Sequence, residues 1–90
     1  MNDAYFKSVE RSLRKYYGPD VKLYRSTRSD KKFMVFNPEG KKIHFGQKGY
    51  ADWHEHNDIK RRDAFRVRNA RWSKSPKWSP AHLSYYVLWD

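Results

Sequence analysis

The residues best suited to chemistry gather in one stretch, HFGQKGYADWHEHND, which holds three of the four histidines of the chain. His54 and His56 are two residues apart, and on an extended segment this spacing places both imidazoles on one face. His44, Asp52 or Asp58 could add further nitrogen and oxygen ligands, so the stretch is a candidate site for zinc or manganese. A basic protein with such a site could also be a metal-dependent nuclease.

The same stretch fits an ordinary junction between a β-hairpin and a helix, and this is the interpretation that we favour. Structural zinc needs four ligands of fixed geometry, the chain has no cysteine, and the spacing is neither His-Glu-x-x-His nor a zinc-finger pattern. Gly46 and Gly49 allow positive φ angles where the strand must turn, and Asp58 can cap the following helix. His54 and His56 would then be partly exposed polar residues near that cap, and we expect no cofactor and no catalytic residue.

A second candidate site is the basic segment from Ile59 to Trp78, where eight Lys and Arg residues outnumber a single acid, Asp63. Guanidinium groups match phosphate oxygens in geometry, and aromatic rings between them can stack on bases. Because the chain contains no recognised DNA-reading motif, we expect contacts mainly to phosphate. A merely solvated basic surface and a surface for anionic partner proteins are the open alternatives. The residues predicted to bind nucleic acid are Lys60, Arg61, Arg62, Arg66, Arg68, Arg71, Lys74, Trp72 and Trp78.

Length and composition limit the classes of protein that fit. Ninety residues fill one hydrophobic core, so we expect a single domain over residues 1–90 without a deep substrate cleft. Only 38% of the residues are apolar and the mean hydropathy is −1.16. The four Trp, seven Tyr and five Phe can nevertheless build a core, because each ring buries roughly 150–250 Å². The formal charge of +10 attracts polyanions.

Two absences in the sequence guide the expected location. Without cysteine there is no disulfide framework. No run approaches the roughly 18 consecutive apolar residues of a membrane span, and the first residues carry charges in place of an apolar signal segment. We therefore expect an intracellular protein that is not secreted and has no membrane partner.

The first segment, Asp3 to Tyr17, predicts an amphipathic helix within residues 1–18. Asn2 or Asp3 can cap its start, and Gly18 can end it. The basic side chains fall on the side opposite the apolar ones, so we expect one face on the core and one in water. At about 100° per residue, one arc of about 120° contains the apolar side chains Tyr5, Phe6, Val9, Leu13, Tyr16 and Tyr17.

The middle of the chain predicts β structure. Residues 21–27, VKLYRST, alternate apolar and polar side chains in the manner of a strand. The run FMVF, the turn from Asn37 to Gly40 and the run KKIHF predict a hairpin from Phe33 to Phe45. Because FMVF is apolar at every position, we expect a central strand covered on both faces.

Two more helices are expected, and they complete the fold class. A basic helix from about Ile59 to Arg71 follows Asp58, although its apolar residues fall on two separate arcs. Ser79 and Pro80 can cap and begin a short helix at the C-terminus. The prediction is an α+β fold: a single small domain with an N-terminal helix, a short antiparallel β-meander of about three strands, a basic helix and a C-terminal short helix.

Several of these motifs occur in the same order in a known family. The chain resembles a family of short basic proteins encoded by large nucleocytoplasmic double-stranded DNA viruses of protists and algae. The likeness covers roughly residues 31–89, a family-like core that leaves the N-terminal helix outside. It implies a viral origin and a shared fold, and it places no catalytic residue on this sequence. The motifs that carry it are the Lys-Lys-aromatic strand with its Asn37-Pro38-Glu39-Gly40 turn, His44-Phe45-Gly46, Gly49-Tyr50, the step from Asn57-Asp58 into an Arg-rich helix, and the ending from Ser79-Pro80 to Leu88-Trp89.

Charge and resemblance together predict a non-enzymatic, largely sequence-independent nucleic-acid-binding protein of a large DNA virus, with DNA as the first partner to test. The alternative is a minor virion component that docks on acidic capsid proteins, because the aromatic surface is large for so small a core. The metal-dependent nuclease is a second alternative. The resemblance implies a location inside the infected host, in the viral factory or the nucleus, and in the virion.

Overall fold

The computed structural model describes residues 2–90 and begins with helix α1 (Asp3–Tyr17). Asn2 caps its first turn, because the side-chain Oδ1 accepts a hydrogen bond of 2.8 Å from the backbone N–H of Tyr5. Gly18 ends the helix with a φ of 104°, a conformation that favours glycine. The N-terminal helix is therefore confirmed with its predicted bounds. The residues that it buries on its apolar face include Val9, Leu13 and Tyr17.

Three antiparallel strands follow in the spatial order β1, β2, β3. Strand β1 (Tyr24–Arg25) is much shorter than the strand predicted over residues 21–27: residues 21–23 lie outside it, and residues 27–30 already turn the chain back. Strands β2 (Lys31–Phe36) and β3 (Lys42–Gln47) form the predicted hairpin. The β-meander of three strands is thus confirmed, with a shorter first strand.

Side-chain hydrogen bonds close the hairpin turn. The Oδ1 atom of Asn37 accepts from the backbone N–H of Glu39 at 3.1 Å and from that of Lys41 at 2.8 Å. Gly40 takes a φ of 82° in the same turn. These contacts fix the register in which Phe33 lies opposite Phe45.

Strand β2 is the centre of both the sheet and the core. Phe33 and Val35 expose none of their surface, and Met34 on the opposite face of the strand exposes 9%. The central strand covered on both faces is therefore confirmed, except that Phe36 at its end is 41% exposed.

Two helices follow the sheet where one was expected. Helix α2 (Trp53–His56) is a single turn that the sequence pattern did not reveal, so His54 and His56 lie on a helix and not on an extended segment. Helix α3 (Ile59–Arg68) begins at the predicted cap, Asp58, but ends three residues before the predicted Arg71. The chain tightens there into the 3₁₀-helix η1 (Ala70–Lys74), and the backbone N–H of Asn69 still bonds to the carbonyl of Phe65.

The C-terminal helix is confirmed and continues further than a short helix. Helix α4 (Pro80–Leu83) begins with the predicted cap, since Ser79 Oγ accepts from the backbone N–H of His82 at 3.2 Å. It continues without a break into a π-helical turn, η2 (Ser84–Leu88). Leu83, Val87 and Leu88 are buried, so this segment supplies much of the core.

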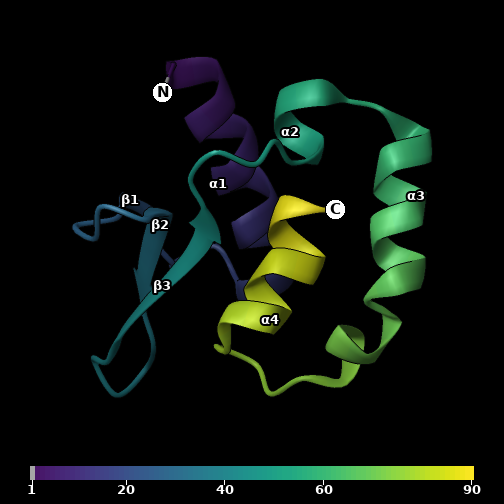
Figure 1. Cartoon of the computed structure of the whole chain (residues 1–90). Helices are drawn as coiled ribbons and strands as arrows, with labels where there is room; N and C mark the ends of the chain where they lie inside the picture. The colour runs from purple at the N-terminus through teal and green to yellow at the C-terminus, as the bar shows by residue number, and fades with distance from the viewer. Residues whose placement is uncertain (1) are drawn as a thin grey trace.

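The C-terminal helix is the element around which the others are arranged. Figure 1 shows α4 and the turn after it between the sheet on one side and α3 on the other, with α1 running behind. Side chains of α1, β2, β3 and the C-terminal segment form one hydrophobic core, whereas no residue of α3 is fully buried. None of the helices within residues 2–90 combines the length and the apolar composition needed to cross a bilayer.

We expect Phe33→Ala to lower the free energy of unfolding by about 3–5 kcal/mol, because the ring is fully buried and its removal leaves a cavity. Phe36→Ala, on the same strand, should cost about 1 kcal/mol or less, since that ring is 41% exposed. Urea denaturation of both variants measures the difference. Equal losses would contradict the assignment of Phe33 to the centre of the core and of Phe36 to its edge.

Candidate functional site

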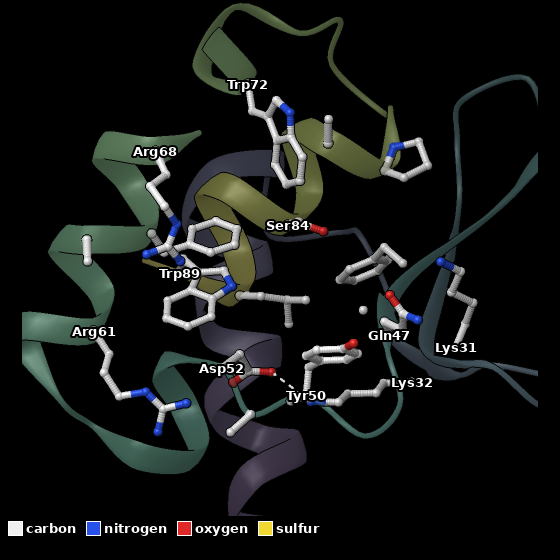
Figure 2. A pocket seen from close by; sticks show the side chains of 18 residues that line it. Lys31, Lys32, Gln47, Tyr50, Asp52, Arg61, Arg68, Trp72, Ser84 and Trp89 are labelled. Atoms are coloured by element: carbon white, nitrogen blue, oxygen red, sulfur yellow. Dashed lines mark hydrogen bonds and ion pairs between the residues drawn. The ribbon is translucent and has the colours of Figure 1, made fainter. Parts of the chain in front are cut away.

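A groove of about 690 Å³ lies between α3 with η1 on one side and β3 with the C-terminal helix on the other. Figure 2 shows Arg61, Arg68 and Trp72 on the α3 side, with Gln47 and Tyr50 across from them. Its volume falls in the range of clefts that take small ligands, roughly 300–1,000 Å³. From the chain length we expected no deep substrate cleft. The groove nevertheless forms, because α3 contacts the rest of the domain through only a few side chains.

Helical spacing decides which basic residues of α3 face the groove. Arg61, Phe65 and Arg68 are separated by four and three residues, so they share one face of the helix. Trp72 extends this row into η1 and also lines the groove. The structure thus brings together three of the residues predicted to bind nucleic acid, Arg61, Arg68 and Trp72.

Aromatic contacts hold α3 against the C-terminal helix. The rings of Phe65 and Trp89 are stacked, with 4.2 Å between their centroids and 7° between their planes. The ring of Trp72 lies 5.8 Å from that of Phe65 at 75°. Each such pair contributes about 0.5–1.5 kcal/mol beyond the area that it buries. All three rings line the groove, so the same side chains that position α3 also form part of the wall of the groove.

Two of the predicted phosphate ligands instead fasten α3 to the domain. The Arg66 guanidinium donates to the carbonyl oxygens of Trp89 at 2.7 Å and Tyr85 at 3.3 Å, and it lies 4.3 Å from the centre of the Tyr85 ring. The guanidinium of Arg62 lies 4.8 Å from the ring of Trp53 and forms an ion pair with Asp63. These contacts satisfy donors that would otherwise be available to a ligand.

The remaining predicted ligands lie outside the groove. Lys60, Arg71 and Lys74 are exposed on α3 and η1. Trp78 lies elsewhere, with its ring 4.7 Å from that of Tyr17 and its backbone N–H donating to the Tyr17 hydroxyl at 3.3 Å. Burial raises the pKa of Tyr17 to about 12, although this hydrogen bond acts in the opposite direction. Trp78 is therefore separated from Trp72 and belongs to the packing of α1.

Lys32 joins the sheet side of the groove to two helices. Its Nζ atom lies 2.5 Å from Glu55 Oε1, 3.4 Å from Asp52 Oδ2 and 2.5 Å from the carbonyl oxygen of Tyr50. Asp52 is buried, and its Oδ2 also accepts from the hydroxyl of Tyr5 on α1 at 2.5 Å. Lys32 is thus fully occupied by the protein.

The ionisation of this cluster follows from its burial. Desolvation, and then the neighbouring carboxylate of Asp52, raise the pKa of Tyr5, so its hydroxyl stays a donor at neutral pH. Burial alone would raise the pKa of Glu55, but the hydrogen bond and charge of Lys32 outweigh it and hold that pKa below its usual value. The cluster therefore keeps the charges that its hydrogen bonds require.

Three cations in the groove are left for a ligand. Within residues 2–90, Lys31, Arg61 and Arg68 form no salt bridge, and the only acid that lines the groove, Asp52, is already matched by Lys32. Lys31 lies on the sheet side and the two arginines on the α3 side. Both sides of an aromatic groove therefore carry unmatched positive charge, which favours an anionic ligand.

The histidines of the candidate metal stretch each hold different neighbours together. His54 contacts Ser8 Oγ through Nδ1 at 2.6 Å and the carbonyl oxygen of Val87 through Nε2 at 2.7 Å. His44 Nδ1 contacts Ser26 Oγ at 2.7 Å, and His56 Nδ1 accepts from the backbone N–H of Asp58 at 2.9 Å. In the described part of the chain, no three His, Asp or Glu side chains converge as metal ligands.

Sequence reasoning missed several residues of the site. Asp52 and Glu55 form a capping box at the start of α2, and the Asp-x-x-Glu spacing was a readable signal for it. Tyr50, Gln47 and Trp89 had no comparable signal, because they meet only after the C-terminal helix has returned to the sheet.

The comparison with protein families matches residues 21–69 to a family of unknown function, DUF5754. This match spans more than half of the chain, and the protein belongs to that family. It covers the sheet, α2 and α3, which form part of each side of the groove, and it ends before Trp72 and the C-terminal helix. No curated protein and no solved structure matches the chain.

The two roles assigned to the arginines of α3 are separable by stability measurements. Arg66→Gln should lower the free energy of unfolding by about 1–3 kcal/mol, because the carbonyls of Trp89 and Tyr85 lose a charged donor. Arg68→Gln, two residues away and exposed, should change it by no more than about 0.5 kcal/mol. Thermal or urea unfolding checks this, and a larger loss in Arg68→Gln would reverse the assignment.

Proposed function

We propose that this protein is a non-enzymatic nucleic-acid-binding protein that contacts mainly the phosphate backbone. The observation that supports it is the set of unmatched cations around the groove, Lys31, Arg61 and Arg68. Exposed Lys60, Arg71 and Lys74 extend the same positive field along α3 and η1.

The positive charge is concentrated in one segment and is not spread evenly over the chain. The segment Ile59 to Trp78 holds eight of the twenty Lys and Arg residues and only one acid, Asp63, and that acid is paired with Arg62. Guanidinium groups bind phosphate oxygens in two-pronged geometry, and they carry no base preference when they contact the backbone. Binding should therefore be strong at low salt and largely independent of sequence.

Binding to labelled nucleic acid across a salt series tests the proposal. For duplex DNA, the logarithm of the association constant should fall linearly with the logarithm of salt concentration, with a slope of about −0.9 for each phosphate contact. The triple variant Lys31→Gln, Arg61→Gln, Arg68→Gln should make that slope shallower by up to about 2.7 and weaken binding at low salt.

A matched control variant distinguishes the effect of the groove residues on binding from the effect of net charge. The variant Lys7→Gln, Arg11→Gln, Lys22→Gln also removes three positive charges, all from exposed residues outside the groove. We expect it to retain most of the wild-type slope. Equal effects of the two variants would reduce the proposal to non-specific attraction, and a complex that is insensitive to salt would contradict it.

A second candidate function is docking on a partner protein, and the outer face of α3 favours it. Ile59 and Val67 lie on one arc of this helix and are 58% and 77% exposed, unusual for branched apolar side chains. In this proposal α3 bridges to an acidic virion protein through an apolar stripe flanked by basic residues.

Co-purification with a capsid protein of the same source after nuclease digestion tests the docking function. The complex should survive digestion and should be lost in Ile59→Ser, Val67→Ser, while the salt-dependent binding of nucleic acid stays as in the wild type. A complex that disappears on digestion would show that nucleic acid, and not α3, bridges the two proteins.

A further inference from the structure

We infer that the groove between α3 and the sheet binds an unpaired base, which makes the protein a binder of single-stranded nucleic acid. The inference rests on the proposed function and names the form of nucleic acid that the groove takes. It depends on the rings, the polar groups and the charges of the groove, each of which comes from a different element.

Tyr50 is the first observation. Within residues 2–90 it is the only Phe, Tyr or Trp side chain that has no other aromatic ring as a neighbour, and it is 68% exposed. Its backbone carbonyl is fixed by Lys32, so the residue is held at the edge of the groove although its ring is free. An exposed ring on a fixed backbone is a stacking surface without a partner.

The opposite side of the groove offers further rings. Trp72 and Trp89 project toward the hollow from η1 and the C-terminal end, facing Tyr50 and Gln47 across it. Trp89 is already stacked on Phe65, which fixes its plane. A flat ligand that enters the groove therefore meets aromatic surface on both sides, an arrangement that favours stacking of a base.

Polar groups are few and converge on the same space. Gln47 at the end of β3 and Ser84 at the start of η2 both line the groove. An amide supplies a donor and an acceptor, and a hydroxyl supplies either, so both can bond to the edge of any base. Lys31, Arg61 and Arg68 are placed at the borders to contact the phosphates on either side of that base.

The occupant must be single-stranded for a geometric reason. In a duplex each base is stacked between its neighbours, so its faces are closed to Tyr50, Trp72 and Trp89. Phosphates are accessible in both forms. The cations alone would bind duplex and single strand alike, and only the rings discriminate between them.

The experiment compares a labelled oligothymidine with a duplex of the same length at one salt concentration. The wild type should bind the single strand about tenfold more tightly or better. Tyr50→Ser should weaken single-strand binding by roughly 5- to 100-fold, the effect of losing one stacked base, and leave duplex binding unchanged. Tyr24→Ser removes another exposed tyrosine, 40% exposed and outside the groove, and should change neither.

A second variant tests the aromatic side chains on the opposite side of the groove. Trp72→Leu retains apolar contact with Phe65 and should also weaken single-strand binding selectively. Circular dichroism verifies that each variant is folded, and quenching of tryptophan fluorescence by the single strand should decrease in Trp72→Leu. A free mononucleotide should compete poorly, because it lacks the flanking phosphates.

Each outcome has one meaning. If the wild type binds both forms equally, or if Tyr50→Ser and Trp72→Leu weaken both forms alike, the groove does not receive a base and only this inference fails. If a mononucleotide competes as well as the oligonucleotide, the groove is a nucleotide pocket and the inference also fails. If neither form binds at low salt, the proposed function itself is wrong.

Discussion

The ammonium group of Lys32 joins the sheet to the segment that leads into α2 and to helix α1, and the sheet side of the groove depends on this contact. It is largely withdrawn from water, and it is balanced by Asp52, which caps α2, by Glu55 within α2 and by the carbonyl of Tyr50. Burying such charges costs several kcal/mol for each ion unless all partners are in place, so the cluster permits one arrangement of its contributors. That arrangement ties β2 to α2 and, through Tyr5, to α1. Since only two residues separate α2 from α3, the place where α3 begins is limited by this cluster as well.

The basic residues of α3 fall into two sets on different faces of the helix. One face presents Arg61, Phe65 and Arg68 to the groove, and the neighbouring face uses Arg62 and Arg66 to contact rings and carbonyls of the domain. The two sets have the same chemistry and differ only in what lies opposite them. The basic segment is therefore not one uniform exposed surface, and substitutions of Arg62 or Arg66 should change the stability of the fold.

Features of the fold and the groove were predictable from the sequence where the residues that contact each other are close in the chain. The cap at Asn2, the turn at Asn37 and the apolar run of β2 are local signals, and the first helix and the hairpin were predicted from them. The groove has no local signal. It forms only when Trp89 stacks on Phe65 and when Lys32 reaches Asp52, contacts between residues about 20 positions apart. The sequence pattern also could not show that Arg66 contacts the domain whereas Arg68 lines the groove.

Helix α3 contributes no fully buried side chain. Its side chains contact the domain mainly through the stacked pair Phe65–Trp89, through the Arg66 guanidinium on two carbonyls and over a tyrosine ring, and through the Arg62 guanidinium over an indole. The buried core is formed by side chains of the other elements. We therefore expect α3 to open locally more readily than the core elements, so that its amide hydrogens exchange through partial openings that leave the core folded. Because α3 forms one wall of the groove, the width of the groove depends on those few contacts. A ligand bound to both walls would hold α3 in place and slow the exchange of its amide hydrogens.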